Sequence, residues 1–138
     1  MKKLWRKIFK SEKGFTLVEL MIVIIILAVL TGIAVPSYMA LRNRARESAT
    51  ESEMKNIATA LELYQADNEV YPLTAGYPAG ITAYMNPVPA NDDWGNAYAY
   101  VSAAGAAYTL TSTGADGAAA GGDDLVITDG QWTTTGAY

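Results

Sequence analysis

The most apolar stretch of the chain extends from Leu20 to Val35, with the sequence LMIVIIILAVLTGIAV. Counted from Phe15 to Val35 it comprises 21 residues, about 31 Å as a helix at ~1.5 Å per residue, which matches a hydrocarbon core of about 30 Å. A secretory signal peptide fits poorly, because its apolar region is shorter and a small-residue cleavage site should follow it. A plain single-span membrane anchor fits this segment and remains open.

The segments on either side of this stretch differ in character. Residues 1–14 hold six basic side chains against Glu12, so the positive-inside bias predicts a cytoplasmic N-terminus and a C-terminal domain across the membrane. Pro36 follows the apolar stretch, removes a helix hydrogen bond and disfavours helix just before it. Together with Gly32 it predicts a kink or a melted stretch; the alternative is a helix that ends at the membrane surface.

A second helix-forming segment extends from Ser37 to Asp67, without Gly or Pro. Its apolar positions recur at steps of three and four residues and predict a stripe that packs on a sheet. The segment should end near Asn68, because Pro72 blocks its continuation. The predicted stripe consists of Met54, Ile57, Ala58, Leu61 and Tyr64.

The C-terminal part has short apolar runs separated by turn residues. Residues 73–90 are predicted as a loop, and residues 98–102, 108–112 and 125–128 as strands. We expect an antiparallel sheet of about three strands, packed on the second half of the helix, with Trp94 and Trp132 at its edge or sealing it. The predicted fold is therefore α+β, with one long N-terminal helix.

The amino-acid composition excludes several kinds of catalytic and metal site. The chain has no cysteine and no histidine, so a thiol nucleophile, a Cys/His metal site and a Ser-His triad are excluded. From Asn56 onward there are nine acids and no Lys or Arg, so this part should repel nucleic acid. A membrane-anchored enzyme would have to use adjacent carboxylates such as 92/93 or 123/124, but adjacent acids are usually turn residues. We predict no enzymatic activity.

Glu19 is an ionisable residue near the start of the membrane segment. A carboxylate there costs about 2–3 kcal/mol, and such groups are functional by default. The segment that contains it, KGFTLVELMIVIIILAVLTGIAVP from Lys13 to Pro36, closely resembles the N-terminus of type IV pilins and type II secretion pseudopilins. The resemblance implies that a prepilin peptidase cleaves between Gly14 and Phe15. It also implies N-methylation of the new Phe15 amine and loss of the leader.

Physical reasoning gives Glu19 an assembly role. After cleavage the chain carries a negative carboxylate and a new positive amine, and both need partners in lipid. In a stacked array the amine of one subunit can pair with Glu19 of its neighbour and so fix the register. We therefore expect Phe15, Glu19 and Pro36 to be assembly residues.

Three further segments resemble major pseudopilins: ALELYQADNEVYP from Ala60, DWGNAY from Asp93, and an acidic Gly-rich loop over residues 112–124. In the loop Asp116, Asp123 and Asp124 lie within nine residues, and Ca²⁺ favours such oxygen ligands. By resemblance, the carbonyls of Thr113 and Gly121 would complete the site. The alternative is a solvated acidic loop without an ion.

The expected organisation has four parts: a cleaved leader (1–14), a transmembrane and assembly helix (15–36), an amphipathic helix (37–68), and a loop with the sheet (69–138). The resemblance implies a major pseudopilin of a type II secretion system, which forms a periplasmic filament, a homo-oligomer that drives protein export. Its expected partners are prepilin peptidase, an inner-membrane assembly platform and minor pseudopilins or pilins. The alternative is the major subunit of a surface type IV pilus, although many pilins carry a disulfide that this chain cannot form.

Overall fold

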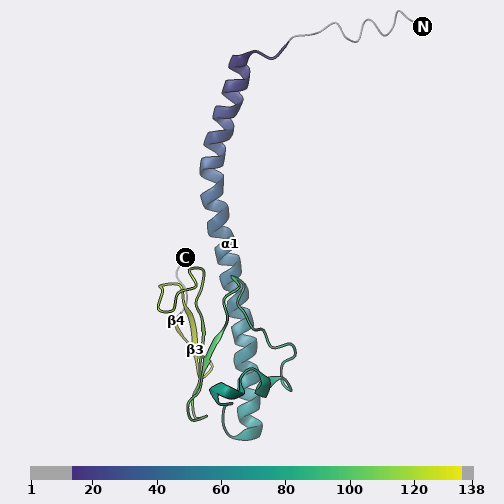
Figure 1. The fold of residues 1–138 in the computed structure, drawn as a ribbon, viewed down its shortest axis with the longest axis vertical. Helices are drawn as coiled ribbons and strands as arrows, with labels where there is room; N and C mark the ends of the chain where they lie inside the picture. The colour runs from purple at the N-terminus through teal and green to yellow at the C-terminus, as the bar shows by residue number, and fades with distance from the viewer. Residues whose placement is uncertain (1–13, 135–138) are drawn as a thin grey trace, which may run out of the picture. The chain divides into compact units, whose positions relative to one another are not determined.

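The computed structural model describes residues 14–134, so nearly all of the predicted leader lies outside the described residues. The chain divides into two compact units between Met39 and Ala40. The first unit is the N-terminal part of a helix, and the second carries the rest of that helix and a sheet (Figure 1).

The predicted long N-terminal helix is confirmed, and it joins the expected segments 15–36 and 37–68. Helix α1 covers Leu17–Asn68 without interruption, with Pro36 inside it. Pro36 has no N–H, so the carbonyl of Gly32 lacks its usual helical donor, yet the neighbouring turns keep the helix continuous. Neither a helix end nor a melted stretch is found at Pro36.

The N-terminal part of α1 exposes its apolar side chains on all sides. Every residue from 14 to 42 is exposed, including the whole apolar stretch. Among the described residues, α1 is the one helix long and apolar enough to cross a membrane. A helix that is apolar all round needs lipid or other helices around it, in agreement with the predicted membrane segment.

Four antiparallel strands form the sheet, in the order β1-β2-β3-β4. A row of apolar residues crosses it in register, from Tyr100 to Leu110, to Ile127 and to Trp132. The three predicted strands are confirmed, with slightly shorter bounds for two of them. The strands are β1 (Ala99–Val101), β2 (Thr109–Ser112), β3 (Leu125–Thr128) and β4 (Gln131–Thr134).

Strand β4 was not predicted, because Trp132 was expected at the sheet edge or sealing the sheet, and not within a strand. The signal that was overlooked is the turn before it. Asp129 and Gly130 both have positive φ, 49° and 76°, which is the backbone of a type I′ hairpin turn. An Asp-Gly pair between β-forming residues is a strong hairpin signal.

The core lies between the second half of α1 and one face of the sheet. Alternate strand residues point inward, as the period of two requires, and meet the predicted helix stripe. Four residues of that stripe are buried, and Tyr64 is half-buried beside them. The buried apolar residues are Met54, Ile57, Ala58, Ala60, Leu61, Ile81, Tyr98, Tyr100, Tyr108, Leu110, Leu125 and Ile127.

The predicted loop after the helix is ordered by contacts to β1. It contains two short 3₁₀ helices, η2 (Thr74–Gly76) and η3 (Ala79–Ile81). The hydroxyl of Tyr100 donates to the carbonyl of Pro72 at 2.7 Å. These contacts close one end of the core.

Tyrosine burial predicts alkaline unfolding of the C-terminal unit. Burial raises the pKa of Tyr77 to about 12, and it also raises the pKa of Tyr98 and Tyr108. A raised pKa in the folded state gives stability that is fully present below the ordinary value of about 10 and is lost as the pH rises further. We expect the free energy of unfolding of residues 37–138 to fall steeply above pH ~10, as measured by denaturant titration.

The Tyr77→Phe variant tests this interpretation. The Tyr77 hydroxyl is buried and has no hydrogen-bond partner among the described residues. Its removal should therefore leave the stability at neutral pH unchanged or raise it by up to about 1 kcal/mol, and it should weaken the alkaline loss. The exposed Tyr38→Phe should change neither quantity. A pH profile identical in Tyr77→Phe and the unmodified chain would contradict the assignment.

Candidate functional site

Helix α1 begins with a capping box that contains Glu19. The Thr16 hydroxyl and the Thr16 backbone N–H both donate to Glu19 Oε2, each at 2.8 Å. In return, the Glu19 N–H donates to Thr16 Oγ1 at 3.2 Å. This reciprocal arrangement is the capping box of a T-x-x-E sequence. Thr16 was not among the predicted residues, although the spacing is readable in the sequence.

The capping box satisfies one oxygen of Glu19 but not its charge. Both donors on Thr16 are neutral, so they leave a full negative charge on a segment apolar enough to enter lipid. A carboxylate near a helix N-terminus is also favoured by the helix dipole. The geometry therefore holds Glu19 in a defined position and leaves it able to bind a cation.

The predicted cleavage position lies just before the capping box. Gly14 precedes the helix, and a Cβ built on it would meet no atom within 4 Å. Phe15 is 83% exposed. The Gly14–Phe15 peptide bond is thus open to a protease, whereas bonds inside α1 are tied into the helix.

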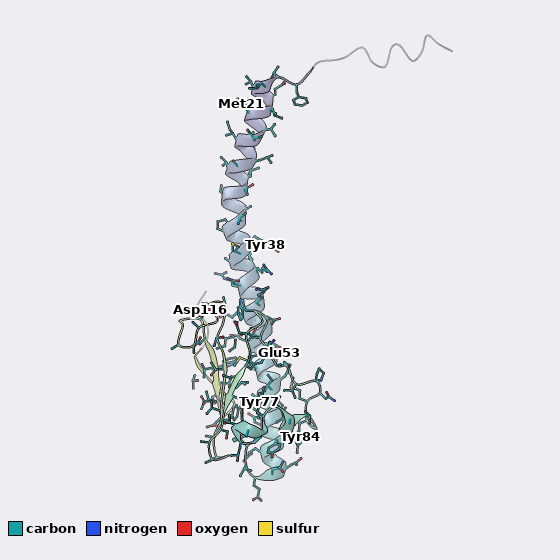
Figure 2. The ribbon with its side chains drawn as sticks, in the orientation of Figure 1. Met21, Tyr38, Glu53, Tyr77, Tyr84 and Asp116 are labelled. Atoms are coloured by element: carbon teal, nitrogen blue, oxygen red, sulfur yellow. The ribbon has the colours of Figure 1, made fainter. Side chains whose placement is uncertain are left out.

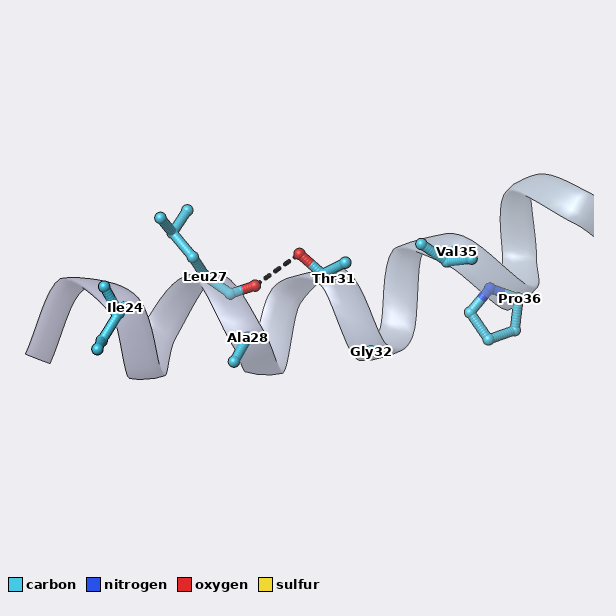
Figure 3. A pocket seen from close by; sticks show the side chains of 7 residues that line it. All are labelled: Ile24, Leu27, Ala28, Thr31, Gly32, Val35 and Pro36. Carbon is cyan, nitrogen blue, oxygen red and sulfur yellow. Dashed lines mark hydrogen bonds between the residues drawn. The ribbon is translucent and has the colours of Figure 1, made fainter. Parts of the chain in front are cut away.

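A shallow apolar groove lies along α1 before Pro36 (Figure 3). It is open because Ala28 has a small side chain and Gly32 has none. A Cβ built on Gly32 would meet no atom outside its own turn of helix within 4 Å. The hydroxyl of Thr31 donates to the carbonyl of Leu27 at 2.7 Å, which keeps this polar group satisfied within the helix. The groove is lined by Ile24, Leu27, Ala28, Thr31, Gly32, Val35 and Pro36.

The acidic loop between β2 and β3 brings two of the three predicted carboxylates together. A Cβ at Gly121 would lie 2.7 Å from Asp116 Oδ2 and 2.8 Å from Asp123 Oδ1. Asp123 Oδ2 also accepts from the N–H groups of Ala115 (2.7 Å) and Asp116 (3.1 Å). Gly121 is therefore required at a point where two carboxylates face the same space.

Asp124 is oriented differently. It is 7% exposed, and its Oδ2 accepts from the N–H of Ala120 at 2.7 Å. Its Oδ1 is buried without a hydrogen-bond partner in residues 14–134. An oxygen in that state is unfavourable unless a cation or water binds it.

The fit of a cation to this loop is partial. Asp116 and Asp123 supply hard oxygen ligands, and no Lys or Arg occurs after Lys55 to neutralise them. Across the described residues, no group of three acidic side chains is arranged to hold a metal ion. The described residues therefore offer two facing carboxylates, Asp116 and Asp123, and not a complete set of carboxylate ligands for a metal ion.

The Asp92–Tyr98 turn supports the acidic loop. Asp92 Oδ1 accepts from the N–H groups of Trp94 (3.0 Å) and Asn96 (2.8 Å), and its Oδ2 accepts from the Ser112 hydroxyl at 2.6 Å. The Asn96 side chain donates to the carbonyl of Gly114 at 2.7 Å. Both oxygens of Asp92 are thus used to hold the turn, as the turn interpretation predicted and as a catalytic pair would not require.

Comparison with protein families gives two matches. The model for "Type II secretion system (T2SS), protein G" matches residues 37–129, and the model for "Prokaryotic N-terminal methylation motif" matches residues 9–35. No solved structure matches the chain.

Curated relatives agree with these models. Type II secretion system core protein G of Pseudomonas aeruginosa is 34% identical over 133 residues, covering 83% of this chain and 92% of the relative. The protein of the same name from Vibrio cholerae is 32% identical over 143 residues, covering 91% and 95%. The type IV wide pilus major component PilA4 of Thermus thermophilus is 37% identical over 82 residues, covering 59% and 61%. The chain therefore belongs to the type II secretion system protein G family, the major pseudopilins, which are structural and not enzymatic proteins.

Proposed function

We propose that the chain is inserted in the bacterial inner membrane, cleaved between Gly14 and Phe15, and assembled into a periplasmic filament that drives protein export. The observation that supports this most directly is the position of Glu19, held by Thr16 at the start of an apolar helix. A cation from a second subunit would neutralise a charge that the subunit itself leaves uncompensated. The new Phe15 amine is the proposed cation.

Assembly by this route needs the proposed partners of the family. Prepilin peptidase would release the amine, and an inner-membrane platform with minor pseudopilins would start the filament. The apolar groove around Gly32 would receive a neighbouring helix, because small residues allow close helix approach in lipid. Glu19 would then favour the correct register between subunits, because a misplaced neighbour would leave its charge unpaired.

Mass analysis of the purified subunit tests the processing step. The native protein should begin at Phe15 with a methylated amine, and a Gly14→Glu variant should retain its leader and form no filament. Loss of the chain should also stop export of the cell's secreted enzymes. A native subunit that still begins at Met1 would remove the proposal.

A surface type IV pilus is the second candidate function. Its support is the match to a pilus subunit of Thermus thermophilus, which covers 61% of that protein. Cells that lack the chain distinguish the two functions. Lost motility or DNA uptake with intact enzyme export would favour the surface pilus.

Ca²⁺ is the proposed ligand of the acidic loop. Asp116 and Asp123 would hold it beside Gly121, Asp124 would add an oxygen, and the carbonyls of Thr113 and Gly121 would complete the shell. When bound, the ion neutralises clustered acids and ties together a loop with few apolar side chains. The support is the approach of both carboxylates to one point.

Chelation should therefore destabilise the C-terminal unit. A ligand at about 100 times its Kd adds roughly 2.7 kcal/mol, so removal of Ca²⁺ should lower the Tm of residues 37–138 by about 10–20 °C. Asp116→Asn combined with Asp123→Asn should abolish the Ca²⁺ response, whereas Asp67→Asn, at an acid outside the loop, should keep it. A Tm that is the same with Ca²⁺ and with chelator would contradict the metal site.

A further inference from the structure

Among residues 14–134, the three arginines at the start of the C-terminal unit form no close ion pair with an acidic side chain. Arg42 and Arg44 are exposed and Arg46 is half-buried. The charge of Arg44 acts on Glu47, where it opposes the rise that burial gives to the pKa of that carboxyl. Lys55, the next cation, lies over the ring of Trp132 at 5.8 Å. We call Arg42, Arg44 and Arg46 the basic patch. Each copy thus presents three cations on one segment of its helix, with Glu47 as an electrostatic neighbour of Arg44.

The other end of the same helix segment is acidic in an unfavourable place. Asp67 is in the last turn of α1, no basic residue accompanies it there, and Glu69 follows the helix end. Negative charge at a helix C-terminus opposes the helix dipole. We call Asp67 and Glu69 the acidic tip.

The backbone of Glu69 adds a second unfavourable choice. Its φ is 66°, and its N–H donates to the carbonyl of Gln65 at 2.7 Å. This is the left-handed position after a helix, where glycine is preferred because it has no Cβ. An exposed glutamate that opposes both the helix dipole and the backbone preference does not stabilise its own fold. Such departures from local rules are expected at functional positions.

The two surfaces cannot meet within one copy. Arg44 and Glu69 are separated by the helix, about 37 Å at ~1.5 Å per residue. Asp67 also accepts a hydrogen bond from the hydroxyl of Tyr84 at 2.8 Å, and Tyr84 lies at the opposite end of the domain from Asp116 (Figure 2). Complementary surfaces at opposite ends form a heterologous, head-to-tail contact, which grows into an open filament.

We propose that the basic patch of one subunit binds the acidic tip of a second copy in the filament, and that this contact sets the polarity of stacking. The inference rests on the proposed filament function. The second copy is favoured as the partner because, beyond the leader, the chain has no other cluster of cations to meet its nine acids after Asn56. Anionic phospholipid is the competing partner, since Arg42 lies about 9 Å beyond Pro36 in a helix.

Cysteine cross-linking tests the contact directly, because the chain has no native cysteine. Full-length chain with Ala45→Cys and Val70→Cys keeps every charge and places a thiol beside each surface. Oxidised filaments of this double variant should give a ladder of trimers and longer products, whereas each single variant should stop at dimers. The control pair, Ala45→Cys with Ala119→Cys, places the second thiol on the acidic loop and should give no ladder.

Charge reversal then tests the chemistry of the contact. Arg42→Glu, Arg44→Glu and Arg46→Glu together should reduce the ladder at least tenfold, and adding Asp67→Arg with Glu69→Arg should restore it. Filaments that form without the 45–70 ladder would overturn the contact and leave the proposed function standing. A reduction that the second set of changes fails to restore would also overturn it, and would favour phospholipid. Absence of filaments from the unmodified chain would overturn the proposed function itself.

Discussion

Replacing Glu19 by alanine should abolish filament assembly while leaving the subunit inserted in the membrane and cleaved. An unpaired amine in a lipid-like interior costs about 2.5–3.5 kcal/mol, and each 1.4 kcal/mol corresponds to a tenfold change. We therefore expect roughly 60- to 300-fold less filament. The measurement is the sheared filament fraction by immunoblot, with the N-terminal mass as the check on processing.

Two variants separate the charge from the helix cap. Glu19→Gln keeps a hydrogen-bond acceptor for Thr16 but removes the charge, so it should fail almost as completely as Glu19→Ala. Thr16→Val removes the hydroxyl that donates to Oε2 at 2.8 Å and keeps the charge. Its effect should be that of a lost cap, about 0.5–2 kcal/mol of helix stability. Normal filament yield from Glu19→Gln would show that the cap, and not the charge, is what assembly needs.

The helix and strand features were readable because their signals are local. The stripe through Met54, Ile57 and Leu61 follows the helix period, and these residues are all 0% exposed. The strand at residues 125–128 has the period of two and is found with the predicted bounds. An apolar stretch of membrane length predicted the exposed part of α1.

Other features depend on contacts that the sequence does not display. Ile81 is fully buried, but it belongs to a loop rich in Pro and Gly that has no period to read. Asp124 was grouped with Asp116 and Asp123 by spacing and by the resemblance of the loop to major pseudopilins. In the structure its Oδ2 accepts from the N–H of Ala120, so only its Oδ1 is left to join the other two carboxylates. Strand β4 is short, and the only sequence signal for it is the Asp-Gly pair in the turn before it.

Removing the side chain of Tyr108 should be among the most destabilising changes in the C-terminal unit. Tyr108 is 1% exposed, and its ring centroid lies 4.8 Å from the ring centroid of Tyr71 and 5.9 Å from that of Tyr100. Its hydroxyl also accepts from the N–H of Gly130 at 3.0 Å, in the turn before β4. Truncating a buried aromatic residue to alanine costs about 3–5 kcal/mol, a large part of a typical domain stability of about 5–15 kcal/mol.

The Tyr108→Phe variant separates packing from the hydrogen bond. It keeps both ring contacts and leaves the Gly130 N–H without its acceptor, so we expect a loss of about 1–3 kcal/mol. Urea unfolding of residues 37–138 measures both variants, with the exposed Val101→Ala as the control, which should change stability by less than about 0.5 kcal/mol. Because Tyr108 joins the aromatic core to the β3–β4 turn, amide exchange in β4 should accelerate in Tyr108→Phe before it does in α1. Equal stability of Tyr108→Ala and the unmodified chain would show that this ring does not hold the sheet to the core.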